Sequence, residues 1–506
     1  MKNKFLQGTL ILLVTSILLR GLGFAYQMLI VRFAGTEAVG LLNMSFPFYI
    51  ILVVLATAGM PVAIAKLTAE YVSRGKEWQI TSMMRTAFLL VGILSLCGLA
   101  AAVFLLPRLF ALLGTEDRVA CCFCVLIPGI LIVPFSSVMR GYFQGMQQMI
   151  YPSLGQVAEQ VIRVVSGLIL IVWVCPRDVI SLAMGLAAAA MLGELGGLIL
   201  LWGFYLYTRH KQKRKAGSPT RKNNSVLPDL VALGLPTTFT RLTSSVDMAI
   251  EASLVPFCLM AVGYNASQAA GIYGQFSGVA VSLITIPTVL TGALATALIP
   301  AVSEADAAKN QRTLEQRCRQ SVRITWMFSL PVILVIYVYG EQLCRILFHI
   351  EGLGAMMRML SFGAVFMYLE QTVVGILQGL GQTKTVFVNN FMGSAAKLIG
   401  MYYCIRILEW GSIGIAGGMV LGYGLQCLLN LAALSRNVQI RMSWREMMLP
   451  VAGSAGMLAV IRGVSSFQME YNIILLLAMG VGGCLYLLFL LITGQISDLT
   501  GRKKEY

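Results

Sequence analysis

Four basic side chains interrupt long apolar stretches of this 506-residue chain. They are Arg20, Arg163, Arg241 and Lys397, whereas the other Lys and Arg residues lie in or beside short polar segments. A cation in hydrocarbon costs at least ~2.5–3.5 kcal/mol on insertion scales, so such residues usually face a protected cavity or an opposite charge. Their chemistry would therefore be either the binding of an anion, such as a phosphate, or the pairing of buried charges.

Arg20 and Arg241 are the candidates for anion binding. Arg20 has no acidic residue within one helical turn, and a guanidinium group binds phosphate through two parallel hydrogen bonds. Arg241 would lie on the counterpart helix in the second half of the chain, and two arginines across a cleft would suit a pyrophosphate. Two alternatives stay open. Arg20 could pair with a carboxylate on another helix, and Arg241 could extend to the nearby membrane surface.

The remaining two cations have candidate acidic partners. Glu159 and Arg163 are spaced i, i+4, so we expect them to share a helix face and neutralise each other. The alternative is a gating pair that exchanges partners between conformations. Glu194, in the following apolar segment, could partner either arginine. Lys397 has no acidic residue four positions earlier, so its expected partner is Glu370.

A second acidic pair indicates ion coupling. Asp247 and Glu251 are also spaced i, i+4, and two like charges on one buried face repel unless a cation or a proton intervenes. We expect Na⁺ or H⁺ here, with Asn389 or Asn390 as further oxygen ligands. The alternative is that Glu251 reaches the membrane surface while Asp247 pairs with Arg241. With two His and eleven scattered Cys, no zinc-ligand spacing occurs, and we expect no metal and no cofactor.

The elements that carry these residues are predicted to be membrane-spanning helices. The chain is 58% hydrophobic and only 12% charged, with a mean hydropathy of +0.79, whereas a soluble chain is about 25% charged. The net charge of +16 lies in short loops, as is typical of cytoplasmic loops, so we expect no nucleic-acid partner. No nucleotide-binding motif and no catalytic constellation occurs, which argues against an enzyme.

Apolar windows of about 20 residues predict about fourteen transmembrane helices. They are expected near 7–33, 38–66, 80–106, 119–146, 152–175, 179–208, 228–258, 270–301, 322–340, 355–381, 384–406, 412–435, 446–464 and 472–494. With the N-terminus in the cytoplasm, every loop lysine falls on the inner side. We therefore predict a multi-pass protein of the cell membrane with both ends cytoplasmic.

An internal repeat organises these helices. The segment Gly141-Tyr-Phe-Gln-Gly-Met-Gln-Gln recurs as Gly375-Ile-Leu-Gln-Gly-Leu-Gly-Gln, 234 residues later. The same offset carries Arg163 onto Lys397. Glycine pairs spaced i, i+4 allow close helix packing, which accounts for the glycines but not for the matched glutamines.

The repeat predicts two pseudo-symmetric lobes in an all-α fold. We expect an N-lobe of six helices in 1–208, a basic cytoplasmic linker in 209–227 and a C-lobe of six helices in 228–435. Two extra helices and a basic tail would follow in 436–506. Parallel repeats of this kind are common in transporters, with the substrate near the membrane midplane between the lobes.

Several segments, taken together, resemble a known family. They are Arg20-Gly-Leu-Gly-Phe, Ala58-Gly-Met-Pro-Val-Ala-Ile-Ala-Lys-Leu, Arg140-Gly-Tyr-Phe-Gln-Gly, Gln156-Val-Ala-Glu-Gln-Val-Ile-Arg, Leu235-Pro-Thr-Thr and Ala297-Leu-Ile-Pro-Ala-Val-Ser-Glu. The chain resembles, over essentially its whole length, polysaccharide-biosynthesis flippases of the multidrug/oligosaccharidyl-lipid/polysaccharide (MOP) exporter superfamily, and their sporulation branch in particular. The resemblance implies a two-lobed bundle of fourteen helices that moves a lipid-linked saccharide precursor across the membrane. For the sporulation branch it implies peptidoglycan precursor for the spore cortex.

The resemblance also implies a role for Arg20. Related lipid II flippases hold the substrate pyrophosphate with arginines in a central cavity, and Arg20 matches the first of them. Where those flippases carry a second arginine, this chain has Tyr26, and no arginine occurs in the second predicted span before Gly59. Arg241 is the candidate replacement.

The expected partners are a polyprenyl-pyrophosphate-linked saccharide and membrane lipids. We expect a monomer, with proteins of cell-wall synthesis as candidate partners. The alternative function is a cation-coupled multidrug exporter of the same superfamily. Its cargo is usually cationic, and a cavity lined by arginines should repel such a cargo.

Overall fold

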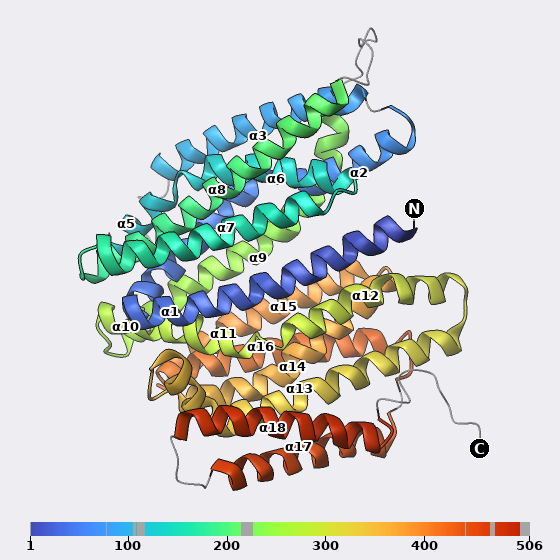
Figure 1. The fold of residues 1–506 in the computed structure, drawn as a ribbon. Helices are drawn as coiled ribbons and strands as arrows, with labels where there is room; N and C mark the ends of the chain where they lie inside the picture. Colours follow the sequence, from blue (N-terminus) through green and yellow to red (C-terminus); the bar gives the residue numbers. More distant parts are fainter. Residues whose placement is uncertain are drawn as a thin grey trace. The chain divides into compact units, whose positions relative to one another are not determined.

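The computed structural model describes residues 2–76, 78–104, 108, 117–213, 226–440, 442–465 and 471–495. Every regular element in these ranges is helical, and the predicted all-α class is confirmed (Figure 1). Most of the predicted basic linker 209–227 and the end of the predicted basic tail lie outside the described residues.

The chain forms two compact units, residues 1–279 and 280–506. The helices of the first unit are α1 (Lys2–Thr57), α2 (Met60–Ser73), α3 (Trp78–Phe104), α5 (Asp117–Leu126), α6 (Gly129–Gly145), α7 (Ile150–Ile169), η1 (Leu170–Val174), α8 (Val179–Lys213), α9 (Leu227–Ala261) and α10 (Ala266–Gly274), with η2 (Gln275–Ala280) at the boundary. Those of the second are α11 (Val281–Ile284), α12 (Thr288–Ala307), α13 (Gln311–Phe348), α14 (Gly354–Gly379), α15 (Thr383–Tyr402), η3 (Tyr403–Ile407), α16 (Ser412–Ser435), α17 (Trp444–Ser465) and α18 (Tyr471–Ile492).

These helices make the chain a multi-pass membrane protein. In the described ranges, eleven helices are long and apolar enough to cross a membrane, or up to twelve if the bent pair α5–α6 is one span. The segment Val14–Ser73 counts once, although its 60 residues would measure roughly 90 Å against ~30 Å of hydrocarbon. The helical conformation breaks inside it, at Gly35 (φ 81°, ψ 165°). The α15 helix does not count, because it carries polar residues such as Asn390 and Lys397. The number fourteen stays a prediction.

A second break separates α1 from α2 and sets a close contact with α9. Gly59 there has a φ of 64°, a left-handed conformation that glycine adopts without a steric cost. A Cβ built on Gly59 would overlap the carbonyl of Gly234 on α9, and a Cβ on Gly234 would overlap the carbonyl of Ala58. The two backbones touch because neither glycine has a side chain. Such breaks are tolerated in membranes where neighbouring helices cover the freed backbone groups.

The internal repeat is visible as a reciprocal contact between α1 and α10. A Cβ built on Gly40 would overlap the carbonyl of Ala270. A Cβ built on Gly274 would likewise overlap the carbonyl of Thr36. The repeat offset carries Thr36 onto Ala270 and Gly40 onto Gly274. Gly40 thus contacts the repeat equivalent of Thr36, and Thr36 contacts the repeat equivalent of Gly40. Such a reciprocal contact marks a local two-fold relation.

The same offset governs packing inside each unit. In the first unit, Gly141 of α6 lies against Pro61 of α2, and a Cβ on Gly141 would be 2.6 Å from the Pro61 carbonyl oxygen. In the second unit, Gly375 of α14 lies against Ala295 of α12, where the corresponding distance is 2.7 Å. Both the glycines and their partners are 234 residues apart. The recurring motif therefore marks a helix contact that the chain builds twice.

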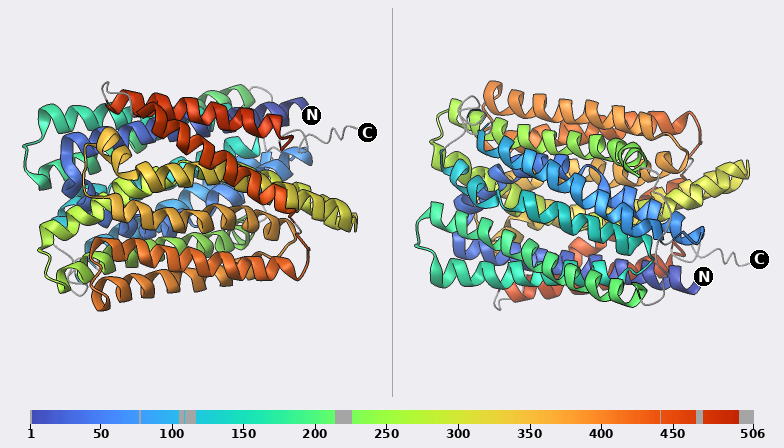
Figure 2. Two further views of the ribbon diagram at one scale, coloured as in Figure 1. Left: turned by 90° about the horizontal axis from the view of Figure 1, so that it is seen from below. Right: turned by 90° about the horizontal axis from the view of Figure 1, so that it is seen from above.

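The structure groups the helices differently from the sequence repeat. The α9 and α10 helices pack against α1 and belong to the first unit, although they open the second copy of the repeat. The predicted lobe boundaries at 208, 228 and 435 stay a prediction. Figure 2 shows the long helices from two further directions.

A buried arginine ties the last two helices to the second unit. Arg323 of α13 donates from Nε to the side chain of Gln495 at 3.1 Å and from Nη2 to its carbonyl at 2.8 Å. Nη1 of Arg323 donates to Glu446 of α17 at 3.2 Å, and Arg319 pairs with the same carboxylate at 2.7 Å. Because Gln495 follows α18 directly, these contacts fix both α17 and α18 on α13.

Candidate functional site

Arg20 lies on α1 and Arg241 on α9, two helices that pack together in the first unit. Both side chains are exposed, and neither has an ion pair or hydrogen bond to a residue in the described ranges. Apolar residues flank Arg20 on both sides in the sequence. It lies roughly 22 Å along the helix before the break at Gly35. An exposed guanidinium group without a protein partner is available to an anion.

The structure brings three of the predicted charged residues together in the first unit. Arg163 of α7 pairs with Glu159 at 2.9 Å and with Glu194 of α8 at 3.4 Å. Glu159 also pairs with Arg140 of α6 at 2.7 Å. We call these four residues the charge cluster. The cluster joins three helices and has no net formal charge. The attraction between its opposite charges offsets the cost of placing each ion in a poorly solvated region.

Sequence reasoning missed Arg140. The sequence groups it with the basic residues that lie in or beside short polar segments, whereas it lies inside α6 with its side chain 20% exposed. The signal in the sequence that could have found Arg140 is its position directly before Gly141, the first glycine of the Gly141–Gly145 pair. Close packing of those glycines on α2 fixes the rotation of α6 and so directs Arg140.

Hydrogen bonding within the charge cluster is incomplete. Arg140 Nε, Arg163 Nε and Glu194 Oε2 are buried and lack a hydrogen-bond partner in the described part of the chain. The hydroxyl of Tyr49 on α1 is in the same state. Buried polar groups are rarely left unpaired. These atoms have the capacity for further hydrogen bonds, so the ion pairs of the cluster are not the only ones that its members can form.

Close packing of α7 on α8 makes the charge cluster possible. A Cβ on Gly193 of α8 would lie 2.8 Å from the carbonyl oxygen of Glu159 and 3.0 Å from Cβ of Arg163. Only glycine allows this approach, and it brings the adjacent Glu194 within reach of Arg163. The glycine thus sets the geometry of the ion pairs.

The second unit holds a polar network of a different kind. The side-chain amide of Gln426 on α16 donates to Glu370 of α14 at 3.0 Å and to Asn390 of α15 at 2.6 Å. Asn389 donates to Asn430 at 2.8 Å. Glu370 is 9% exposed. A buried carboxylate thus accepts a hydrogen bond from a neutral amide in the interior of a helical bundle.

Lys397 and Glu370, the predicted pair, both lie in the second unit. Lys397 lies half-buried on α15, and the absence of a side chain on Gly422 of α16 makes room for its Cβ. The described contacts of Glu370 are with Gln426. The pairing of Lys397 with Glu370 stays a prediction.

The predicted ion-coupling residues are divided between the two units. Asp247 and Glu251 lie half-buried on α9 in the first unit. Asn389 and Asn390 lie on α15 in the second unit, where both make amide hydrogen bonds. Among the described residues, no group of three or more His, Cys, Asp or Glu side chains could hold a metal ion. A shared ion site stays a prediction.

Comparison with protein families gives two matches. Residues 5–306 match the family described as "Polysaccharide biosynthesis protein", and residues 277–403 match the family MatE. The first match covers more than half of the chain.

Two curated relatives come from Bacillus subtilis (strain 168). The chain is 29% identical over 452 residues to "Stage V sporulation protein B", a match that covers 89% of this chain and 87% of the relative. It is 24% identical over 541 residues to "Lipid II flippase MurJ", which covers 99% of this chain and 98% of the relative.

Solved structures share the fold. "Lipid II flippase MurJ, inward closed conformation" has a TM-score of 0.70 at 16% identity and covers 96% of this chain and 99% of that chain. An inward-facing multidrug resistance MATE family transporter of the MOP superfamily has a TM-score of 0.68 at 19% identity. It covers 82% of this chain and 93% of that chain. The chain therefore belongs to the polysaccharide biosynthesis protein family and is a membrane transporter of the MOP type.

Proposed function

We propose that this protein is a flippase that moves a polyprenyl-pyrophosphate-linked saccharide, similar to lipid II, across the cytoplasmic membrane by alternating access. The observation that carries the proposal is Arg20, an exposed guanidinium group inside a long apolar helix with no described protein partner. An intramembrane cation is costly, so its presence is a reason to propose a functional site. A pyrophosphate matches its charge and its paired donors.

In this proposal Arg20 and Arg241 bind the pyrophosphate, while the polyprenyl chain stays in the lipid. Both arginines project from helices of the first unit, α1 and α9. Binding replaces the hydration of the phosphate oxygens with charge-assisted hydrogen bonds. Rocking of one lobe against the other then exposes the headgroup on the opposite side of the membrane.

Charge pairs would control the rocking. The unpartnered atoms of the charge cluster, such as Arg163 Nε and Glu194 Oε2, allow Arg163 to favour one carboxylate in one conformation and the other in the next. Because Glu159 also binds Arg140, an exchange would alter the packing of three helices together. We propose this exchange as the gate, with Lys397 and Glu370 as its equivalent in the second unit.

We propose that Na⁺ or H⁺ drives the cycle. Asp247 and Glu251 are like charges one turn apart on α9, and the amide oxygens of Asn389 and Asn390 are suitable further ligands for Na⁺. The buried Glu370 is a second group that could take up a proton.

The relatives' names suggest the cargo and its setting. One relative is named as a lipid II flippase and another as a stage V sporulation protein. We propose peptidoglycan precursor for the spore cortex as the cargo, a location in the cell membrane and cytoplasmic ends for the chain.

A second candidate function is cation-coupled multidrug export. The MatE match over residues 277–403 favours it. The two functions differ in the charge of the cargo. Exposed, unpaired arginines favour an anionic headgroup and disfavour the cationic drugs that a multidrug exporter carries.

One experiment separates these functions. The purified full-length protein is placed in liposomes, and the transfer of three labelled cargoes is measured: lipid II, a shorter polyprenyl-pyrophosphate-linked sugar and a cationic dye. We expect transfer of one or both lipid-linked cargoes and none of the dye. Transfer of the dye alone would establish the exporter and reject the flippase.

A further inference from the structure

A polar cavity lies at one end of the first unit, apart from Arg20 and the charge cluster. It has a volume of about 420 Å³ and is lined by the end of α2, the turn before α3 and the first turns of α9. Leu67, Val226 and Leu233 also line it, and we call these three apolar side chains its apolar floor. The turn from Arg74 to Lys76 follows directly on the apolar segment that ends at Ser73. The cavity therefore opens where the membrane meets water.

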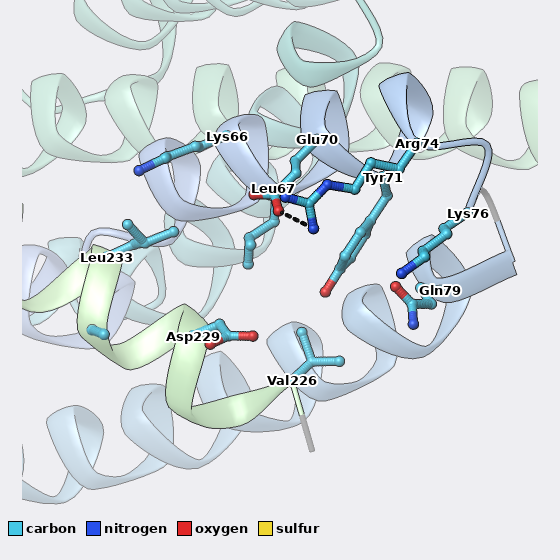
Figure 3. A pocket seen from close by; sticks show the side chains of 11 residues that line it. Lys66, Leu67, Glu70, Tyr71, Arg74, Lys76, Gln79, Val226, Asp229 and Leu233 are labelled. Atoms are coloured by element: carbon cyan, nitrogen blue, oxygen red, sulfur yellow. Dashed lines mark ion pairs between the residues drawn. The ribbon is translucent and has the colours of Figure 1, made fainter. Parts of the chain in front are cut away.

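Charges of both signs face this cavity. Figure 3 shows the hydroxyl of Tyr71, the ammonium of Lys76 and the carboxylate of Asp229 directed toward its middle. Arg74 also lines the cavity and pairs with Glu70 at 2.9 Å. Lys76 and Asp229 make no side-chain hydrogen bond or ion pair with any residue of the described ranges. A cation and an anion thus remain on opposite walls, one near the α2–α3 turn and the other on α9.

The distribution of charge restricts the ligand. A simple polyanion would be attracted by the cavity's cations but repelled by its carboxylates. The cations are Lys66, Arg74 and Lys76, and the carboxylates are Glu70 and Asp229. A ligand that carries both a phosphate and a primary amine satisfies both walls, because the phosphate accepts from Lys76 and Tyr71 while the ammonium donates to Asp229.

We propose that this cavity binds the phosphoethanolamine headgroup of a membrane lipid. The lipid headgroup bridges the α2–α3 turn and α9. The α2 and α9 helices also meet at Gly59 and Gly234, where backbone lies against backbone. Lipid bound in the cavity therefore stabilises the packing of α2 on α9. The inference does not depend on which cargo the protein carries.

The test uses the purified full-length protein and measures lipid retention by native mass spectrometry together with thermal stability. The probes are phosphatidylethanolamine, phosphatidylcholine and phosphatidylglycerol. We expect phosphatidylethanolamine to bind most tightly, because the quaternary amine of phosphatidylcholine has no N–H to donate and phosphatidylglycerol has no cation. Equal binding of all three lipids would overturn the proposal.

Variants locate the site. Asp229→Asn should weaken phosphatidylethanolamine binding about tenfold and leave phosphatidylglycerol binding no weaker, as expected for one charged hydrogen bond. Lys76→Gln should weaken the binding of both lipids. The matched controls are Asp306→Asn and Lys384→Gln, which alter exposed charges in the second unit and should change nothing. Unchanged binding in both cavity variants would place the lipid elsewhere and overturn the assignment.

Soluble glycerophosphoethanolamine identifies the source of the ligand. If it displaces the lipid in the wild type but not in Asp229→Asn, headgroup chemistry alone is sufficient for recognition. If it fails while intact lipid still depends on Asp229, the apolar floor contributes to a lipid-specific site. Displacement that is the same in the wild type and in Asp229→Asn would contradict a site at this cavity.

Discussion

Glu159 accepts charged hydrogen bonds from two arginines on different helices, Arg140 at 2.7 Å and Arg163 at 2.9 Å. Its own side chain is 14% exposed. Removing one member of a buried pair leaves an uncompensated charge, which costs more than the pair contributes. Stability at this position therefore depends on keeping the cluster neutral rather than on any single bond.

We expect Glu159→Gln to destabilise the protein by ~2–4 kcal/mol, below the full range for buried pairs because the partners keep partial exposure. Thermal unfolding in detergent measures the loss. The matched control is Glu70→Gln, whose partner Arg74 is 61% exposed, so its loss should stay under about 1 kcal/mol. Equal losses in the two variants would show that the charge cluster contributes no more than a surface pair.

Some of these contacts were predictable and others were not. The i, i+4 spacing predicts that Glu159 and Arg163 meet, because both lie on one helix face. The contacts with Arg140 and Glu194 depend on how three helices rotate against one another, and one sequence does not reveal that rotation. Gln426 was missed because a neutral amide in a span gives no charge signal.

Glycine contacts determine how closely the helices approach. On α1 and α10, Gly40 and Gly274 meet with backbone against backbone, and a methyl group at either position would overlap a carbonyl. The motif at Gly141 and Gly375 has the same role within each unit. The sequence predicts this repeat, because the offset is constant, but it does not reveal that repeat-related helices α1 and α10 touch.

We expect Gly40→Ala to lower stability by ~1–3 kcal/mol through overpacking. The control is Gly203→Ala on α8, where a Cβ would meet nothing within 4 Å and the better helix propensity should give a gain of about 0.5–1 kcal/mol. Thermal unfolding of both variants checks the difference. A Gly40→Ala variant as stable as the wild type would mean that α1 and α10 are further apart than described.

The α17–α18 pair depends on Arg323, which is 4% exposed. We expect Arg323→Met to loosen this helix pair, because Gln495 loses the two hydrogen bonds that Arg323 donates to it. Glu446 keeps its ion pair with Arg319. Hydrogen exchange in residues 444–465 should increase at least several-fold, and exchange in α14 should not. Arg436→Gln, at an exposed position, is the control. Unchanged exchange in α17 would show that apolar packing alone holds the pair.

For the whole molecule, composition is enough to predict a helical membrane protein. The constant offset of 234 residues between matching segments is enough to predict a repeat. The number of spans was harder. The helical segment from Val14 to Ser73 breaks at Gly35 and again between α1 and α2, and α15 is unusually polar. The grouping of α9 and α10 with the first unit depends on glycine contacts between helices, which no hydropathy profile reports.

The loop charges make a prediction about orientation. Because every loop lysine falls on one side when the N-terminus is cytoplasmic, the C-terminus should be cytoplasmic as well. A green fluorescent protein fused after Tyr506 should then fluoresce, and a phosphatase fused there should be inactive. An active phosphatase fusion would reverse the predicted orientation.

The transfer of labelled lipid II by Arg20→Gln in liposomes is the most direct test of the central claim. Arg20 binds the pyrophosphate in this account, so Arg20→Gln should slow transfer by about tenfold or more, the equivalent of one charged hydrogen bond, while its insertion and thermal stability match the wild type. Arg436→Gln, at an exposed position outside both proposed binding sites, should transfer normally. Wild-type transfer by a well-folded Arg20→Gln would contradict the account.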